Sequence, residues 1–425
     1  MDSLPSVLTT ILQSFQPLMR AEVFTSFGYL LTGVLIGEAK AGTGRASVFA
    51  PAAYWPQRLS DLFCRHKLSG QALMAHLAAV VLAYLYPPGL PERLFWIADA
   101  TYTEKPYAQY IASVDWFHRL KYVAGRAKNL KGHCYVFAAH LYTVGEAQGR
   151  QWASVLVGAL LYVKGRSIPT LVGTLAQHLR LPPMVRPVWL TDSGILSRPL
   201  LRALGTQGHF ALGRLRCNQR VYCAPRCHSA RQRRPRVFGP SSRVDQLLTR
   251  FPHRLRQQQT VLRVRGRERV AHVWDAEILL RGLWPHRALP ARVVLVTVPG
   301  LALAPWYLLC SDLTLEPVEA VHTYAGRFQI EVNFDEVKEL GLGHYQGRSG
   351  QGVRRWPLFL CIAHVLLKFL ATEVLPLPLP TLNWPWSPHE NTVGQVRRRL
   401  IELCRPRISR DKPCTLSEQQ FANAA

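Results

Sequence analysis

The sequence predicts an α/β protein in which helices flank a mixed β-sheet, with a strand-rich basic insertion in the sheet and helical segments at both ends. Between residues 93 and 216, an antiparallel pair of apolar strands precedes strand–helix–strand units, which is typical of a mixed sheet covered by helices. In residues 1–90 and 357–375 the apolar side chains recur at three- and four-residue steps, which indicates helices. These two patterns define the expected architecture.

The charge of the chain indicates a polyanionic partner. Lys and Arg number 52 against 26 for Asp and Glu, which gives a net charge of +26. The 425 residues are 48% hydrophobic, so the chain can bury large cores. Its longest apolar runs either fall short of the ~20 residues that a membrane span needs or carry His or Lys. We therefore predict binding to nucleic acid and not to a membrane.

The cysteines favour a reducing compartment. Nine of them, an odd number, are scattered over the chain, which fits free thiols better than a disulfide framework. The N-terminal residues also lack the basic and apolar regions of a signal peptide. We expect a cytoplasmic, nucleoid-associated protein. One group has spacings that loosely suggest zinc but lacks paired C-x2-C geometry, so free thiols are favoured and metal binding stays open: Cys217, Cys223, Cys227 and His228.

Residues 1–90 are predicted to form a helical N-terminal domain that ends at the PPGLPE sequence. This domain carries several basic residues that could contact DNA, although a structural cap with a solvated basic face explains them equally well. These residues are Lys40, Arg45, Arg58, Arg65 and Lys67.

Residues 93–216 are predicted to form the first part of a core built on a mixed sheet. Two helices are expected there, at 167–181 and 197–208, each preceded by a capping serine, Ser167 or Ser197. The connection after residue 144, GEAQGR, is typical of a hairpin. Strands are expected at 94–101, 133–144, 151–164, 186–194 and 209–216.

Residues 217–303 are predicted to form a β-rich, arginine-rich insertion. From Arg214 to Arg269 there are 16 arginines, no lysine and only two acidic residues. Arginine binds phosphate in a bidentate manner better than lysine does, so this region is expected to contact nucleic acid. Alternating apolar residues predict strands at 236–240, 260–274 and 291–300.

The remaining sequence completes the core and then becomes helical. A strand at 304–312 leads into a helix at 315–340, and the core is expected to end at residue 345. The C-terminal segment, 346–425, begins with a loop rich in glycine and arginine that reaches residue 356. It continues with a buried helix at 357–375, a proline-rich linker at 376–392, a short helix at 393–404 and a disordered tail.

The helix at 315–340 is expected to be continuous, with one polar stripe facing outward and one apolar stripe facing a core. The apolar stripe consists of Ile330, Phe334 and Val337. An ordinary amphipathic helix with i,i+4 pairs is the alternative. The polar stripe consists of Tyr324, Arg327, Glu331 and Lys338.

Three carboxylates are candidate metal ligands. Asp99 and Asp192 are expected at the carboxyl ends of buried strands, where ligands gather in such sheets, and Glu331 projects from the helix. Three hard oxygen donors favour Mg²⁺ or Mn²⁺. Two such ions about 3.5–4 Å apart would support phosphoryl transfer. For each aspartate alone, a turn cap at the strand end is the alternative.

Other residues compete for these roles. Asp335 lies one helical turn after Glu331, while Asp115 and Glu104 compete with Asp99 but do not end an apolar run. Three histidines, His118, His133 and His140, are interpreted as ordinary strand or loop residues.

The helix resembles a known signature. Tyr324, Arg327, Glu331 and Lys338 match the Y-x2-R-x3-E-x6-K pattern of insertion-sequence-4-like DDE transposases, which have a retroviral-integrase-like (RNase H-like) core. Asp99 lies in a strand similar to the family's first acidic strand, and Asp192 in a strand–helix unit similar to the second. The interval of 139 residues (331 − 192) can house the insertion of that family. The resemblance covers about residues 93–345.

The resemblance implies a cut-and-paste DNA transposase. Asp99, Asp192 and Glu331 would then hold two Mg²⁺ (or Mn²⁺) ions, and the signature residues Tyr324, Arg327 and Lys338 would bind DNA phosphates. Trp306 is the candidate for stacking on a flipped base, although its run also fits a core strand. The implied partners are transposon ends with inverted repeats, target DNA and a second copy of the chain in a synaptic complex. A structure-specific nuclease and an inactive DNA-binding regulator are the rival hypotheses.

Overall fold

The computed structural model forms two compact units. We call Met1–His76, Gln109–Ala112 and Glu336–Ala425 the terminal unit, and Leu77–Ala108 and Ser113–Asp335 the sheet unit. Some residues named in the sequence analysis lie outside the described residues. These are the basic residues Lys40 and Arg45 and the possible zinc ligands Cys227 and His228, together with the side chain of Arg58. The structure describes residues 4–37, 56–118, 128–145, 151–225, 237–264, 267–281, 289–301, 304–345, 347–380 and 392–411.

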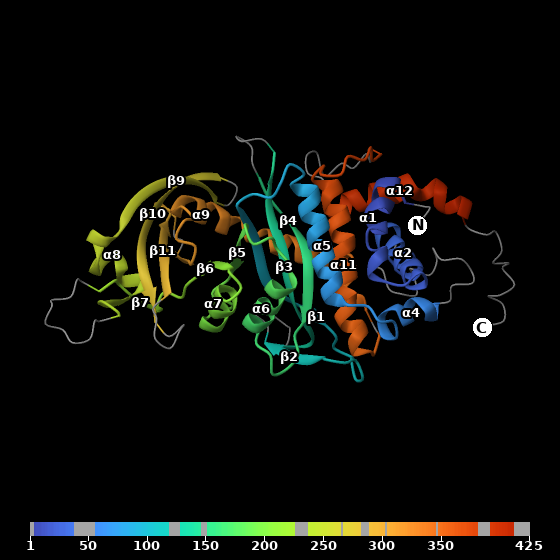
Figure 1. Cartoon of the computed structure of the whole chain (residues 1–425), viewed down its shortest axis with the longest axis horizontal. Helices are drawn as coiled ribbons and strands as arrows, with labels where there is room; N and C mark the ends of the chain where they lie inside the picture. The colour runs from blue at the N-terminus through green and yellow to red at the C-terminus, as the bar shows by residue number, and fades with distance from the viewer. Residues whose placement is uncertain are drawn as a thin grey trace. The chain divides into compact units, whose positions relative to one another are not determined.

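The terminal unit is helical, as predicted for both ends of the chain (Figure 1). Phe27 and Phe63 both pack on Phe359, at ring-centroid distances of 5.4 and 4.9 Å, so N-terminal and C-terminal helices share one core. The helices are α1 (Ser6–Gln13), α2 (Ala21–Ile36), α4 (Pro56–Cys64), α5 (Gly70–Leu85), α11 (Gly350–Ala371) and α12 (Val393–Asp411), with α5 continuing into the sheet unit.

Helix α11 begins earlier than predicted, because residues 350–356 are helical and not a loop. Ser349 caps it by accepting a hydrogen bond from the Gly352 amide at 3.5 Å. The buried Arg355 guanidinium donates to the carbonyl oxygens of Leu62, Phe63 and Leu68 at 2.8–3.2 Å. These carbonyls belong to a distant part of the sequence, so the polar composition of 341–356 could not reveal the helix. The loop prediction was wrong for these seven residues.

The sheet unit contains the mixed sheet that the sequence predicts, in an arrangement consistent with an RNase H-like fold (Figure 1). Strand β1 pairs antiparallel with β3 and parallel with β5, and β5 pairs parallel with β6. Strand β4 pairs antiparallel with β3 on its other side, and the short β2 also pairs with β3. The bounds are β1 Arg93–Glu104, β2 Asp115–His118, β3 Asn129–Val144, β4 Gln151–Leu161, β5 Arg186–Thr191 and β6 Phe210–Arg214.

The two helices expected in this core are present. Helix α6 (Ile168–His178) starts as predicted, with the Ser167 hydroxyl accepting from the Thr170 amide. Helix α7 (Arg198–Gly205) starts after Ser197, which occupies the predicted N-cap position, but its buried hydroxyl makes no capping hydrogen bond with the described residues. Helix α6 packs on β3 and β4, and α7 packs on β6.

The insertion is strand-rich, as predicted, but it is not a separate sheet. Strand β12 pairs with β6 of the core on one side and with β11 on the other, so hydrogen bonding runs continuously into the insertion. The 260–274 segment is a hairpin of two strands, and the described part of 236–240 is not a strand. The bounds are β7 Arg220–Tyr222, β8 Ser241–Arg243, β9 Arg256–Val264, β10 Arg267–Leu280, β11 Leu289–Thr297 and β12 Trp306–Cys310, with the short α8 at Leu247–Arg250.

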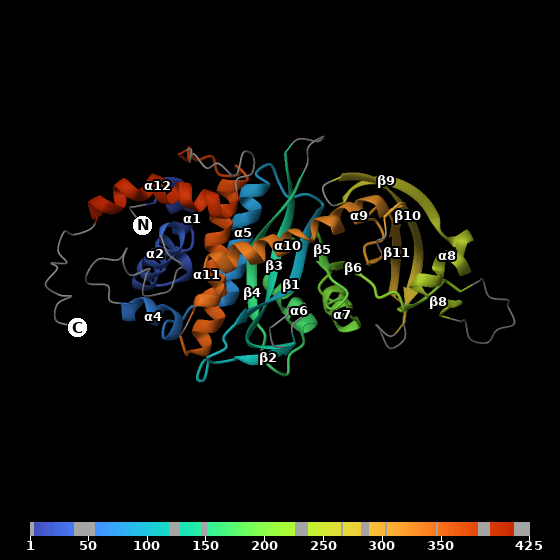
Figure 2. The ribbon, with the colours of Figure 1, turned by 180° about the vertical axis from the view of Figure 1, so that it is seen from behind.

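The segment 315–340 is two helices and not one. Helix α9 (Pro317–Gly326) packs on β9, β10 and β11, and α10 (Gln329–Glu339) follows it (Figure 2). Between them the chain makes a tight turn, in which the Ile330 amide bonds to the Arg327 carbonyl. The predicted continuity was wrong at Gly326, where a Cβ atom would lie 2.8 Å from the Trp152 ring. Close packing against β4 therefore requires glycine, a poor helix former, at the end of α9.

Three further expectations concern the described residues. None of the described helices has the length and hydropathy needed to cross a membrane. All described cysteines are free thiols, including Cys217 and the buried Cys223. His118, His133 and His140 lie in strands β2 and β3, as ordinary strand residues do.

Candidate active site

Asp99 and Asp192 lie level with each other on neighbouring strands. The parallel register of β1 on β5 pairs Ile97 with Leu190, so two further residues along each chain bring the aspartates to the same height. Asp192 directly follows β5, as predicted. Asp99 is not at a strand end, because β1 continues to Glu104 along β3. The pairing of β1 with β5 ends before Asp99. Asp99 therefore lies at the edge of the region where these two strands pair, although it is in the middle of β1.

Asp99 is a largely buried carboxylate whose side chain is 19% exposed, and it has two hydrogen-bond donors among the described residues. Its Oδ2 accepts from Nη1 of Arg327 at 2.9 Å, and its Oδ1 accepts from the Ala100 amide at 2.8 Å. Burial raises the pKa of Asp99 to about 6, although Arg327 opposes the shift; the negative charge of Asp192 adds to it. Asp99 therefore lies close enough to Asp192 for the two charges to interact.

Asp192 is held by the turn that follows β5. Its Oδ1 accepts from the amides of Gly194 and Ile195 at 3.0 and 2.9 Å. The turn-cap alternative is therefore correct for this oxygen. The other oxygen, Oδ2, accepts no hydrogen bond from the residues described in the structure, so the same carboxylate keeps a free donor atom for a cation.

Arg327 lies among all three candidate carboxylates. Besides its bond to Asp99, its Nη2 lies 3.9 Å from Oε1 of Glu331. Burial acts to lower the pKa of Arg327, but Tyr324, Asp99, Asp192 and Glu331 together raise it. Its side chain is 9% exposed, whereas that of Glu331 is 57% exposed. The predicted outward-facing stripe is thus wrong for Arg327, which points into the site.

Helix α10 is fixed on the sheet by its buried side. Ile330, Phe334 and Val337 are buried, as predicted. Phe334 packs on Phe137 of β3 at 5.7 Å between ring centroids, and the Asn333 amide donates to the Ser154 hydroxyl of β4 at 2.7 Å. These contacts set the rotation of the helix that carries Glu331.

Tyr324 extends the site toward the insertion. It is only 3% exposed, so the outward-facing prediction is wrong here too. Its ring lies edge-on to Trp306 of β12 at 6.0 Å, and the Arg327 guanidinium lies 5.8 Å from its ring centroid. Burial raises the pKa of Tyr324, while Arg327 and Arg214 lower it. Arg214, the last residue of β6, is therefore part of this cluster.

Sequence reasoning missed Arg214. One signal could have identified Arg214. It is a basic residue at the end of an apolar strand, and the preceding strand ends just before the candidate ligand Asp192. Lys338 lies in the last turn of α10, in the terminal unit, so its DNA-binding role stays a prediction.

The competing carboxylates lie elsewhere. Asp335 is exposed, and it is Glu331 that faces Arg327 across one helical turn. Asp115 accepts a hydrogen bond from the Trp116 amide in the edge strand β2. Glu104 is the last residue of β1, beyond Asp99.

The donor chemistry of the site fits a hard divalent ion, because all three candidates are carboxylates. Their arrangement is not a ready-made metal centre: no cluster of three His, Cys, Asp or Glu side chains within the described ranges could hold a metal ion. At Asp99 the positive charge is supplied by the guanidinium of Arg327. A divalent ion would therefore compete with Arg327 for this carboxylate.

The chain resembles a known protein family over part of its length. No curated protein matches the chain. Residues 166–366 match the family model of the transposase DDE domain, a family that generally uses divalent metals. The matched segment contains Asp192, Tyr324, Arg327 and Glu331, and it begins after the strand that carries Asp99. The segment 166–366 is therefore similar to the transposase DDE domain, and the sheet unit is consistent with an RNase H-like fold.

Proposed function

We propose that the protein is the cut-and-paste transposase of an insertion sequence of the insertion-sequence-4-like group. It would bind the terminal inverted repeats, cleave the DNA strands at the ends and join the freed 3′ ends to a target. The observation that carries this proposal is the grouping of Asp99, Asp192 and Glu331 around the buried Arg327 in a segment that largely matches the transposase DDE domain.

In this proposal Asp99, Asp192 and Glu331 would hold two Mg²⁺ or Mn²⁺ ions, which would activate the attacking oxygen and neutralise charge on the phosphate. Water or a 3′-hydroxyl attacks phosphorus, a new P–O bond forms and the bond to the leaving oxygen breaks. Asp192 is suited to its role because one carboxylate oxygen is fixed by backbone amides while the other is free. The buried side of α10 holds Glu331 in position.

Cations and aromatic residues would hold the DNA strand. Arg327, when released from Asp99, can bind a phosphate in a bidentate manner. Tyr324 and Lys338 would bind neighbouring phosphates, and Trp306, in contact with Tyr324, remains the candidate for stacking on a base. A net charge of +26 supports binding to long DNA. A homodimer in a synaptic complex and a cytoplasmic, nucleoid-associated location complete the proposal.

The test is a transposition reaction with the full chain. Wild type and the Asp192→Ala variant are incubated with Mg²⁺ and DNA that carries the flanking terminal repeats, and excised and joined products are separated on a gel. We expect excision and joining by the wild type alone. Asp335→Ala serves as a matched carboxylate control on α10 and should retain both reactions.

Two outcomes would contradict the proposal and favour one of its rivals. Cleavage without joining, and without need for the terminal repeats, would identify a structure-specific nuclease. Equal DNA binding by both proteins with cleavage by neither would identify a DNA-binding regulator.

A further inference from the structure

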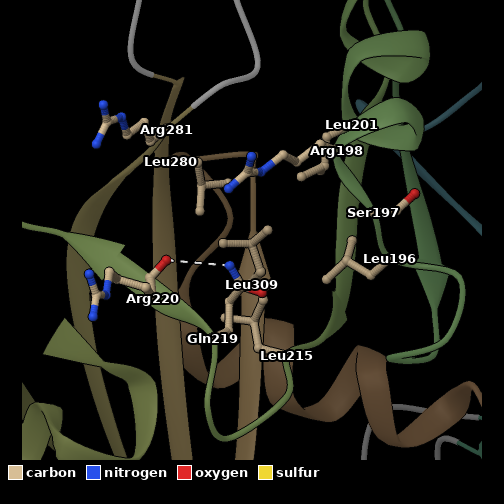
Figure 3. A pocket seen from close by; sticks show the side chains of 10 residues that line it. All are labelled: Leu196, Ser197, Arg198, Leu201, Leu215, Gln219, Arg220, Leu280, Arg281 and Leu309. Carbon is tan, nitrogen blue, oxygen red and sulfur yellow. Dashed lines mark hydrogen bonds between the residues drawn. The ribbon is translucent and has the colours of Figure 1, made fainter. Parts of the chain in front are cut away.

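A cavity of about 270 Å³ lies in the sheet unit, between the core and the insertion (Figure 3). Five leucines line it, and they come from the turn after β5, from α7, from the residue after β6, from the end of β10 and from β12. Three arginines surround these leucines: Arg198 at the start of α7, Arg220 at the start of β7 and Arg281 directly after β10. An apolar wall with several cations is suited to a ligand that has both an apolar face and negative charge.

The three arginines lack acidic partners. None of them forms an ion pair with any residue that the structure describes, and no Asp or Glu lines the cavity. Other arginines of the unit are engaged by carboxylates; Arg93 and Arg186, for example, both bind Asp312. All three are exposed to solvent, so their positive charge beside the cavity is available to an anionic ligand.

The arginines are spread along the cavity and do not converge on one point. In Figure 3 the Arg198 side chain reaches from α7 toward Leu280, while Arg220 and Arg281 stand on the opposite side and point outward. Charges at separate positions match successive phosphates of a strand better than they match one small anion. The facing leucines offer a surface for deoxyribose and for the edge of a base, such as a thymine methyl group.

The turn that follows β5 and contains Asp192 also forms part of the cavity wall. The amide of Leu196, a wall residue, donates to the carbonyl oxygen of Asp192 at 3.0 Å. We infer that this cavity binds one nucleotide of a DNA strand that runs from the active site. Arg198 binds the phosphate of this nucleotide, Arg220 and Arg281, which point away from the cavity, bind neighbouring phosphates, and the leucines contact its sugar and base edge. This inference rests on the proposed function.

Binding of a short single strand tests the inference without catalysis. The full chain is titrated against fluorescent pentathymidylate in EDTA, and anisotropy is recorded at several salt concentrations. The triple variant Arg198→Gln, Arg220→Gln, Arg281→Gln should bind at least about tenfold more weakly. The slope of log affinity against log salt should fall by about 2, because each phosphate contact on a single strand contributes roughly 0.7.

A matched triple variant controls for total charge. The control replaces three exposed arginines outside the cavity, Arg180, Arg250 and Arg263, with glutamine, and it should lose less than about threefold. A second variant, Leu196→Trp, fills the cavity and keeps every charge; it should weaken pentathymidylate about tenfold and leave duplex affinity within about twofold. Thermal melting confirms that each variant is folded.

The outcomes separate the two hypotheses. Equal losses in both triple variants, or unchanged binding by Leu196→Trp, would overturn the cavity assignment while leaving the transposase proposal intact. Competition by thymidine 5′-monophosphate at the same concentration as pentathymidylate would identify a free-nucleotide site and overturn the strand assignment. If the wild type binds neither single-stranded nor duplex DNA, the proposed function itself fails.

Discussion

Asp99 is a largely buried carboxylate and Asp312 a fully buried one, and both lie next to arginine, yet their surroundings move their pKa values in opposite directions. Asp312 accepts from Arg93 at 3.2 Å, from Arg186 at 2.6 Å, and from the amide and hydroxyl of Thr314 at 3.0 and 2.7 Å. Burial acts to raise its pKa, but these hydrogen bonds and charges hold the pKa below its ordinary value. Among the described residues Asp99 has two hydrogen-bond donors, and burial raises its pKa to about 6.

The difference distinguishes a structural carboxylate from a functional one. Asp312 has a donor for each of its oxygens and needs no other partner, so its role is to tie β1, β5 and the segment after β12 together. Asp99 is desolvated without full compensation, which is the usual condition of a group that awaits a ligand. The following predictions test this contrast.

Removing Asp312 should have the largest effect on stability. Asp312→Ala leaves two arginines without their buried partner, and we expect a loss of about 3–5 kcal/mol in the free energy of unfolding. Chemical denaturation monitored by circular dichroism measures it. The control is Asp245→Ala, which breaks a partly exposed pair with Arg243 and should cost no more than about 1 kcal/mol. Similar losses for both variants would contradict the structural role of Asp312.

Neutralising Asp99 should abolish activity and spare the fold. Because burial already favours the uncharged form, Asp99→Asn should change the free energy of unfolding by less than about 1 kcal/mol. DNA cleavage should fall at least about a hundredfold, since even residues behind metal ligands commonly contribute 10- to 100-fold. Asp115→Asn, the matched change in β2, should leave cleavage unchanged. An Asp99→Asn protein with normal cleavage rates would remove Asp99 from the site.

Displacing Arg327 should give an intermediate effect. In Gly326→Ala the new Cβ atom would clash with Trp152, and we expect a loss of about 1–3 kcal/mol in stability together with weaker cleavage. Gly205→Ala, at the end of α7 where no atom lies within 4 Å of the new Cβ, should be neutral or slightly stabilising. Equal effects of the two substitutions would show that the tight turn that begins at Arg327 has no special role.

The pH dependence of stability should show the smallest effect. The lowered pKa of Asp312 means that its contribution is present above its ordinary pKa of 3.8 and is lost as the pH falls through the lower folded value. The difference in melting temperature between wild type and Asp312→Asn should therefore be largest at neutral pH and shrink below about pH 4. A difference that grows toward acid pH would reverse the assigned sign.

The sequence predicted the parts of this account that depend on local signals. Helix α6 was predictable because Ser167 and Pro169 mark its start, and β5 because an apolar run ends at Asp192. The break after Gly326 was not predictable, since it depends on the Trp152 ring in a distant strand. The burial of Tyr324 and Arg327 was missed for the same reason: angular position on a helix does not reveal which neighbour will cover it.

The pairing of Arg327 with Asp99 was also beyond the sequence. The resemblance predicted a phosphate-binding role for this arginine, whereas the structure adds its contact with a candidate metal ligand. Only the three-dimensional register, which brings β1 level with β5, places these groups together.

The most direct test of the central claim is to map where a divalent ion binds. Fe²⁺ can stand in for Mg²⁺, and with ascorbate and peroxide it generates radicals that cut the polypeptide close to the bound ion. In the presence of terminal-repeat DNA, we predict cuts near residues 99, 192 and 331 in the wild type and loss of all three in Asp192→Asn. DNA-bound protein that is cut elsewhere, or that is cut equally in both proteins, would contradict a metal site formed by Asp99, Asp192 and Glu331.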